Sequence, residues 1–101
     1  MEIQGKVALV LGAVKGIGKG IGLALADQGA DLILTRHDWE AEFDAMDQAF
    51  AVSRAEHHIL TADLRSIEDI NKMAAFIRDR YGRLDILINN IERGGWPTVH
   101  G

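Results

Sequence analysis

Cysteine is absent from the 101-residue chain, and proline occurs once, at Pro97. Without cysteine, a disulfide framework, thiolate catalysis and cysteine-ligated metal sites are all excluded. The 15 acidic residues outnumber the 11 basic ones, and no run of Lys or Arg forms a local basic patch. The net charge of −4 therefore disfavours nucleic acid as a partner.

Long apolar runs are absent as well. Even the longest runs, such as Val7–Leu11, are far too short to span a bilayer. The N-terminus lacks the basic and apolar regions of a secretory signal. We expect a cytoplasmic protein with no membrane partner, and a chain of this length has room for at most one domain.

What is present is an alternation of apolar runs and helical patterns. Apolar runs predict strands over residues 6–11, 31–36, 57–62 and 84–89. The first run shows no polar alternation, which is typical of a parallel strand covered on both faces. A β-α-β-α-β-α-β order with short connections predicts an α/β fold.

Three helices are predicted between these strands. The first follows Gly16 and ends at Gly29, the second is capped by Asp38, and the third is capped by Ser66 with Asp69 three residues on. The apolar stripes expected to face the sheet are Ile17, Ile21, Ala24 and Leu25, then Trp39, Phe43, Met46 and Phe50, then Ile67, Ile70, Ala74, Ile77 and Tyr81. Gly18 and Gly22, one turn apart, leave a smooth face that allows close packing.

Right-handed crossovers arrange such a chain as a doubly wound parallel sheet with strand order 3-2-1-4 and helices on both faces. The order reverses between the first and fourth strands. Ligands bind at that point, beyond the carboxyl ends of the strands. Arg36, Asp63 and Asn90 all follow strands at this edge, together with a loop rich in glycine.

That loop, residues 12–18, is called the glycine loop below. Gly12, Gly16 and Gly18 form a G-x-x-x-G-x-G pattern between a strand and a helix. Glycine lets the backbone turn tightly and lie against a ligand. The helix N-terminus that follows offers unpaired N–H groups and a positive dipole end, so the stretch suits a phosphate-bearing ligand.

Three kinds of glycine loop fit this pattern to different degrees. A P-loop would need glycine at Ala13 and a hydroxyl at Gly20, so its magnesium ligand is missing. A methyltransferase-like G-x-G-x-G begins at Gly16, but it would want an acidic residue at the end of the second strand, where Arg36 stands. A nicotinamide dinucleotide loop fits the remaining landmarks.

The stretches GKVALVLGAVKGIG at residues 5–18 and LDILINN at residues 84–90, with Asp63 and Leu64 between them, occur in a specific order and spacing. In these the chain resembles the N-terminal, cofactor-binding half of the short-chain dehydrogenase/reductase family. The resemblance implies a Rossmann-type sheet truncated to about four strands. It implies one partial NAD(P)-binding domain over residues 1–101, with residues 91–101 as an irregular tail.

The resemblance also implies roles for individual residues. The glycine loop would hold the pyrophosphate, Asp63 and Leu64 would contact the adenine, and Asn90 would lie near the ribose and steady the fourth strand's loop. The expected cofactor-binding residues are Gly12, Ala13, Val14, Lys15, Gly16, Ile17, Gly18, Arg36, His37, Asp63, Leu64 and Asn90.

The end of the second strand bears on the choice of cofactor. A carboxylate there bonds a free ribose 2′-OH, whereas a cation attracts a 2′-phosphate. Arg36 offers a planar fork suited to phosphate, Lys15 is a second cation, and His37 assists. We predict NADP(H) over NAD(H). Asp38, a carboxylate close by, keeps NAD(H) open.

Some family features differ here. Leu11 stands where the family usually has a threonine that ties the loop together, and Ile91 and Glu92 replace two small residues near the nicotinamide end. The family's catalytic Ser and Tyr-x-x-x-Lys are not found, since the only tyrosine, Tyr81, has Asp85 four residues on. We expect Tyr81 to pack in the core, and we assign no catalytic residue and no metal site.

Two functional hypotheses follow. In the first, the chain supplies the cofactor-binding half of an NADP-dependent oxidoreductase, and a carbonyl or alcohol substrate requires the C-terminal half. In the second, it is a dinucleotide-binding module without turnover, or a partner subunit. In either case an exposed sheet edge favours self-association.

Overall fold

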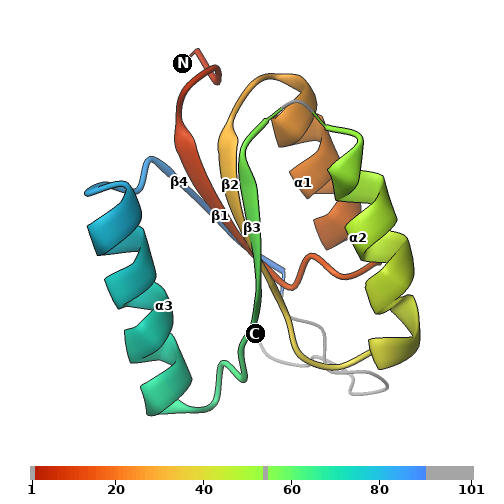
Figure 1. The fold of residues 1–101 in the computed structure, drawn as a ribbon, viewed down its shortest axis with the longest axis vertical. Helices are drawn as coiled ribbons and strands as arrows, with labels where there is room; N and C mark the ends of the chain where they lie inside the picture. The colour runs from red at the N-terminus through yellow and green to blue at the C-terminus, as the bar shows by residue number, and fades with distance from the viewer. Residues whose placement is uncertain (1, 54, 91–101) are drawn as a thin grey trace, which may run out of the picture.

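The fold is a four-stranded parallel sheet with helices on both faces (Figure 1). The computed structural model describes residues 2–53 and 55–90. The strands are β1 (Val7–Leu11), β2 (Asp31–Arg36), β3 (His57–Thr61) and β4 (Ile86–Asn89), in the order β3-β2-β1-β4. The α/β fold and the predicted strand order are therefore confirmed. The expected tail, residues 91–101, lies outside the described residues.

The helices are α1 (Gly16–Asp27), α2 (Phe43–Ala51) and α3 (Ile67–Arg80), with a 3₁₀ turn, η1 (Glu40–Glu42), before α2. In Figure 1, α1 and α2 lie on one face of the sheet and α3 lies on the other. This is the consequence of right-handed crossovers on either side of a central β1.

The uninterrupted apolar run of β1 is explained by burial on both faces. Ala8 and Val10 belong to the core beneath α1 and α2, while Val7 and Leu9 belong to the core beneath α3. Alternate side chains of a strand point to opposite faces, so a strand covered twice is apolar throughout.

Helix α1 packs through its smallest residues. Gly18, Gly22 and Ala26 are its buried positions, whereas Ile17 is 75% exposed and Ala24 is also exposed. The predicted apolar stripe is therefore wrong for Ile17 and Ala24, whereas Leu25 packs against the core as expected and Ile21 is partly buried. The smooth glycine face is confirmed, since a Cβ on Gly22 would stand 2.9 Å from Cζ of Phe50. The close approach leaves room for the Phe50 ring, whose burial contributes about 1.5–3 kcal/mol.

The segment after β2 differs from the prediction. Asp38 does not cap a helix; the chain makes the turn η1 first, and α2 begins at Phe43. Trp39 has a left-handed backbone (φ 71°) and is 38% exposed, so it is not part of the buried stripe. Met46 and Phe50 carry the packing of α2.

Helix α3 begins as predicted, with the Ser66 hydroxyl accepting the Asp69 amide at 3.2 Å. Its buried face agrees with the expected one only at its C-terminal end, where Ile77 is buried and Tyr81 packs against the core. Met73 and Ile77 are buried, while Ile67, Ile70 and Ala74 are exposed. The helix is rotated so that only part of its apolar surface meets the sheet.

The α3 face of β4 is open. Leu87 pairs in register with Leu9 of β1 and so points to the same face, but it is 57% exposed. Among the described strands, β4 pairs with β1 alone, so its other edge carries no partner there. No helix of the described residues is long and apolar enough to cross a membrane.

Candidate functional site

The predicted site residues meet at one edge of the sheet. The glycine loop follows β1, Arg36 ends β2, Asp63 and Leu64 follow β3, and Asn90 follows β4. In a parallel sheet these carboxyl ends lie on the same side, and the order reverses between β1 and β4. The topology therefore brings together residues that are up to 78 positions apart.

The glycine loop ends in the open N-terminus of α1. Gly12 and Gly16 have positive φ angles of 81° and 61°, which a side chain would strain. Lys15, at the N-cap, makes no side-chain cap, and the first turn of α1 holds no acidic residue. The amides of this first turn have no intrahelical acceptor by geometry, so they are available to an anionic ligand.

Ala13 and Val14 are both buried in the core. Only their backbone can face a ligand. The Ala13 amide is itself used, since it donates to the Thr35 carbonyl oxygen at 3.0 Å. These two residues anchor the loop, whereas Gly16 and Ile17 are exposed at its outer side.

Two side chains hold the loop in place, one in β2 and one directly after β4. The Thr35 hydroxyl accepts the Gly12 amide at 3.0 Å, and the Asn90 side-chain amide donates to the Gly12 carbonyl oxygen at 3.3 Å. Thr35 thus ties the loop where Leu11 provides no hydroxyl. Thr35 is not among the site residues predicted from the sequence. The sequence feature that could have indicated it is a polar residue within an otherwise apolar strand. The Thr35 side chain is buried, with 1% exposure.

Gly18 is required by the close approach of α1 to the start of the loop. A Cβ at this position would lie 2.0 Å from the Gly12 carbonyl oxygen and 2.6 Å from the Asn90 side-chain nitrogen. The third glycine of the pattern therefore serves the packing of loop, helix and Asn90.

The Arg36 side chain turns toward α2. Its Nη1 lies 2.9 Å from the Asp47 carboxylate and 3.4 Å from the Phe43 carbonyl oxygen, and its guanidinium sits 4.1 Å from the Phe43 ring centre. Its Nε is buried with no hydrogen-bond partner among the described residues. The guanidinium expected to bind phosphate is thus engaged with α2 in this structure.

Lys15 lies over an aromatic ring. Its Nζ is 3.5 Å from the centre of the Trp39 ring, at a distance typical of a cation–π contact. This places a cation of the glycine loop beside the turn that follows β2.

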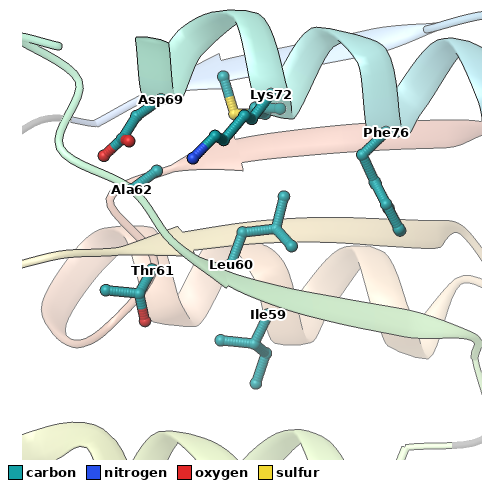
Figure 2. A pocket seen from close by; sticks show the side chains of 8 residues that line it. Ile59, Leu60, Thr61, Ala62, Asp69, Lys72 and Phe76 are labelled. Carbon is teal, nitrogen blue, oxygen red and sulfur yellow. The ribbon is translucent and has the colours of Figure 1, made fainter.

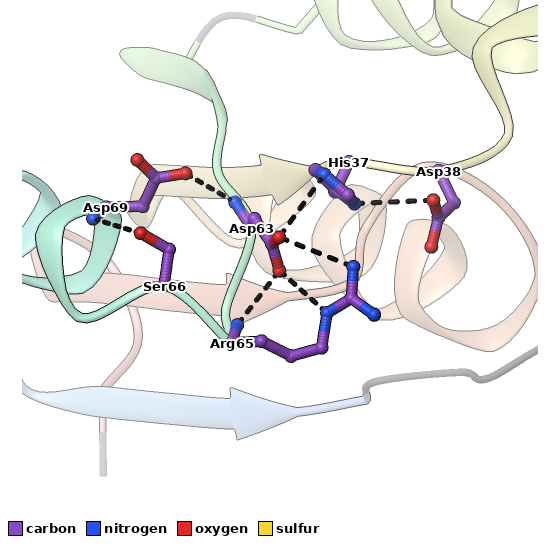
Figure 3. A network of polar contacts seen from close by, with 6 residues as sticks. All are labelled: His37, Asp38, Asp63, Arg65, Ser66 and Asp69. Carbon is purple, nitrogen blue, oxygen red and sulfur yellow. Dashed lines mark hydrogen bonds and ion pairs between the residues drawn. The ribbon is translucent and has the colours of Figure 1, made fainter.

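A polar network joins the ends of β2 and β3 (Figure 3). His37 Nδ1 lies 3.3 Å from the Asp38 carboxylate, and its Nε2 lies 3.8 Å from the Asp63 carboxylate. Asp63 also accepts the Arg65 side chain and amide, each at 3.0 Å. These hydrogen bonds from Arg65 hold the pKa of Asp63 below its ordinary value.

The backbone around this network is fixed by α3. The Asp63 amide donates to the Asp69 carboxylate at 2.8 Å, which positions the start of the connection to Ser66 (Figure 3). Leu64 is half-buried and packs against the core beneath α3. Both residues predicted to contact adenine therefore have well-defined positions.

With this geometry in view, comparison with known proteins decides the family. The family described as short chain dehydrogenase matches residues 6–95. The chain belongs to the short-chain dehydrogenase family. The predicted resemblance is thereby confirmed.

Individual relatives agree with this membership. The chain is 39% identical to a 1,6-dihydroxycyclohexa-2,4-diene-1-carboxylate dehydrogenase of Pseudomonas putida over 98% of its length, which is 36% of that protein. It is 33% identical to a hydroxynaphthalene reductase-like protein of Metarhizium anisopliae over 88% of its length and 33% of that protein. The chain spans about a third of these curated relatives.

A solved structure shares the fold closely. A metagenomic short-chain oxidoreductase, crystallised in complex with NADP, superposes with a TM-score of 0.80 at 32% identity. The match covers 93% of this chain and 42% of that one.

Tyr81 lies away from the glycine loop of this short-chain dehydrogenase chain. It follows α3, and its hydroxyl donates to Glu56, which precedes β3 at the opposite end of the sheet. Burial and the bond to Glu56 raise the Tyr81 pKa. It packs partly against the core, as expected. Among the described residues, no group of three or more His, Asp or Glu side chains could hold a metal ion.

A shallow cavity of about 260 Å³ lies between β3 and α3 (Figure 2). Ile59 and Leu60 line it from the strand, and Lys72 and Phe76 line it from the helix. No residue of the glycine loop lines it, but Ala62 and Asp69 extend it to the carboxyl end of β3, beside Asp63.

Proposed function

We propose that this chain binds a nicotinamide dinucleotide, NADP(H) in preference to NAD(H), and supplies the cofactor-binding part of an oxidoreductase. The whole enzyme would transfer hydride between this cofactor and a carbonyl or alcohol. The observation that carries the proposal is the glycine loop itself, anchored from both sides by Thr35 and Asn90 at the open N-terminus of α1.

The pyrophosphate would lie on the glycine loop. A Cβ on Gly16 would meet nothing within 4 Å, so space is open beside this backbone, and the α1 N-terminus favours negative charge. The residues proposed for this part are Gly12, Ala13, Val14, Lys15, Gly16, Ile17 and Gly18, with Asn90 holding the loop.

The adenine end would lie between the ends of β2 and β3. Asp63 and Leu64 would contact the base, and His37 stands beside Asp63. The cofactor, when bound, supplies the hydride. No described residue is assigned a catalytic role.

The preference for NADP(H) rests on charge. β2 ends in Arg36 and not in a carboxylate, and Lys15 faces the same turn from the loop. A structurally similar relative was crystallised with NADP. Arg36 is paired with Asp47 in this structure, so it would contribute to phosphate binding only after leaving this carboxylate. Lys15 is the cation within the glycine loop itself.

Calorimetric titration of the purified chain with NADPH and NADH tests the proposal. We expect tighter binding of NADPH, with Lys15→Met and Arg36→Ala each losing more affinity for NADPH than for NADH. Equal binding of the two dinucleotides by the wild type would overturn the preference. Binding of neither would overturn the proposed function.

The other sequence hypothesis, a dinucleotide-binding module without turnover, uses the same site. Both hypotheses predict no NADPH oxidation with carbonyl substrates by this chain alone, and detectable turnover would contradict both. We expect the 101-residue chain alone to show no turnover, since no described side chain is placed to transfer a proton. The cytoplasmic location and the single partial domain stay predictions.

A further inference from the structure

Trp39 occupies an unusual position for a large aromatic residue. It has a φ of 71°, the one positive φ among non-glycine residues of the described chain, and its carbonyl oxygen accepts the Glu42 amide at 2.8 Å. A left-handed backbone is a genuine outlier for a bulky side chain. The surrounding turn therefore sets the direction of this indole.

The direction of the indole brings it to Lys15. Trp39 is more than a third exposed, so burial in the core does not explain its placement. The contact it makes is with the Lys15 ammonium, 3.5 Å from the ring centre. Two segments 24 positions apart, the glycine loop and the turn after β2, meet through this pair.

A lysine at a loop is flexible, and holding its ammonium in one place removes an entropic cost of binding. A ring face occupies one side of the ammonium and leaves its other side to donate to an anion. Arg36, the second cation of this edge, is engaged with Asp47 and Phe43.

From these contacts we infer that Trp39 is a positioning residue, which holds the Lys15 ammonium in place for the 2′-phosphate of NADP(H) and so sets the selectivity between the two dinucleotides. The inference rests on the proposed dinucleotide function. It concerns a residue outside the glycine loop that acts through Lys15.

Titration of Trp39→Leu and Trp39→Phe with NADPH and NADH tests this role. Loss of the ring face in Trp39→Leu is expected to weaken NADPH binding about two- to fivefold, the size of a partly exposed cation–π contact. NADH binding should be unchanged. Trp39→Phe keeps a ring face, and its NADPH affinity should stay close to that of the wild type.

The matched control is the same leucine substitution in a Lys15→Met chain. If Trp39 acts through Lys15, removing the ring has no further effect once the ammonium is gone. An equal loss of NADPH and NADH affinity, or a loss that persists in the Lys15→Met background, would overturn the inference. Failure of the wild type to bind either dinucleotide would overturn both the proposed function and this inference.

If Trp39→Leu does not fold, a fluorescence measurement on a chain that retains Trp39 provides a second test. The sequence has two tryptophans, so Trp96→Phe leaves Trp39 as the single reporter. We expect NADP⁺ to change the Trp39 emission more than NAD⁺ does, and Lys15→Met to remove that difference. Identical changes with both dinucleotides would contradict a role at the 2′-phosphate.

Discussion

The Gly12 amide donates to the Thr35 hydroxyl at 3.0 Å and thereby joins the first residue of the glycine loop to β2. The neighbouring amide of Ala13 donates to the Thr35 carbonyl oxygen at the same distance. One threonine thus fixes two successive loop amides. It compensates for Leu11, which offers no hydroxyl at the end of β1.

We expect Thr35→Val to lower the free energy of unfolding by about 1–3 kcal/mol, because the Gly12 amide loses its acceptor in a partly buried place. Dinucleotide affinity should fall as well, since the loop is less well held. Urea unfolding followed by circular dichroism, with calorimetric titration, measures both. Thr35→Ser keeps the hydroxyl and serves as the control. If both variants behave alike, the hydrogen bond has no part in the stability.

Gly18 and Gly20 form a matched pair within α1. Gly18→Ala would push a methyl group against the Gly12 carbonyl oxygen and Asn90, and should destabilise the protein by about 3 kcal/mol or more. Gly20 has open space at its Cβ position, so Gly20→Ala should raise stability by up to about 1 kcal/mol through helix propensity. Thermal unfolding of both variants checks the contrast. Similar Tm values for the two would contradict the close approach at Gly18.

Asp47 pairs with Arg36 at 2.9 Å, and a 2′-phosphate would have to compete with this carboxylate for the guanidinium. Asp47→Asn should free the guanidinium and raise NADPH affinity severalfold while leaving NADH affinity unchanged. Stability should change by no more than about 1 kcal/mol, because Asp47 is half exposed and surface ion pairs contribute little. Asp44→Asn, an exposed carboxylate of the same helix, is the control. An unchanged ratio of the two affinities would show that Arg36 stays on α2.

The lowered pKa of the Asp85 carboxyl in the folded protein makes stability depend on pH. Its carboxylate accepts the Val7 amide at 2.8 Å and the Arg83 side chain at 2.9 Å, and the Val7 bond is the larger cause of its lowered pKa. A lowered pKa in the folded state means that this stabilisation is fully present above the unfolded pKa and is lost as the pH falls through the folded one.

We therefore expect Tm to fall in acid below about pH 4. Asp85→Asn should lower Tm at neutral pH and flatten the acid part of the profile. Asp79→Asn, an exposed carboxylate on α3, should leave both unchanged. An acid profile that is identical in wild type and Asp85→Asn would assign the pH dependence to other carboxyls.

The open α3 face of β4 predicts self-association. Leu87 is 57% exposed on a strand edge that has no partner among the described strands. Sedimentation velocity should show concentration-dependent association of the 101-residue chain, reduced by Leu87→Lys. Val52→Lys, at an exposed apolar residue after α2, is the control. If Val52→Lys reduces association and Leu87→Lys does not, the contact lies elsewhere.

Much of the fold and the location of the site were predictable because they depend on local patterns and chain topology. Four apolar runs with helical segments between them allow few arrangements once crossovers are right-handed. The order 3-2-1-4 is one of these few arrangements, and the gathering of the glycine loop, Arg36, Asp63 and Asn90 at one edge follows from the parallel direction of the strands. The Ser66 cap was equally predictable, because its partner Asp69 is three residues away.

The directions of individual side chains were decided by tertiary packing. Periodicity placed Trp39 and Ile70 on buried stripes, but the left-handed turn before α2 and the rotation of α3 leave both partly exposed. Arg36 was expected to face the ligand, and the structure places it on Asp47, eleven residues on. A pattern of apolar residues indicates which face of a helix is favourable to bury. It does not determine how the helix is rotated about its axis when it packs against the sheet.

The sequence by itself thus indicated a parallel sheet, its strand order, its family and the edge where a dinucleotide would bind, because these depend on local patterns and on the few ways in which right-handed crossovers connect parallel strands. Only the tertiary structure decided which groups hold the loop and which side chains contact the cations Lys15 and Arg36. The Thr35 and Asn90 contacts to Gly12 and the Trp39 contact to Lys15 join residues 23 to 78 positions apart. These contacts form only when the helices and turns pack against the sheet, so local sequence patterns do not specify them.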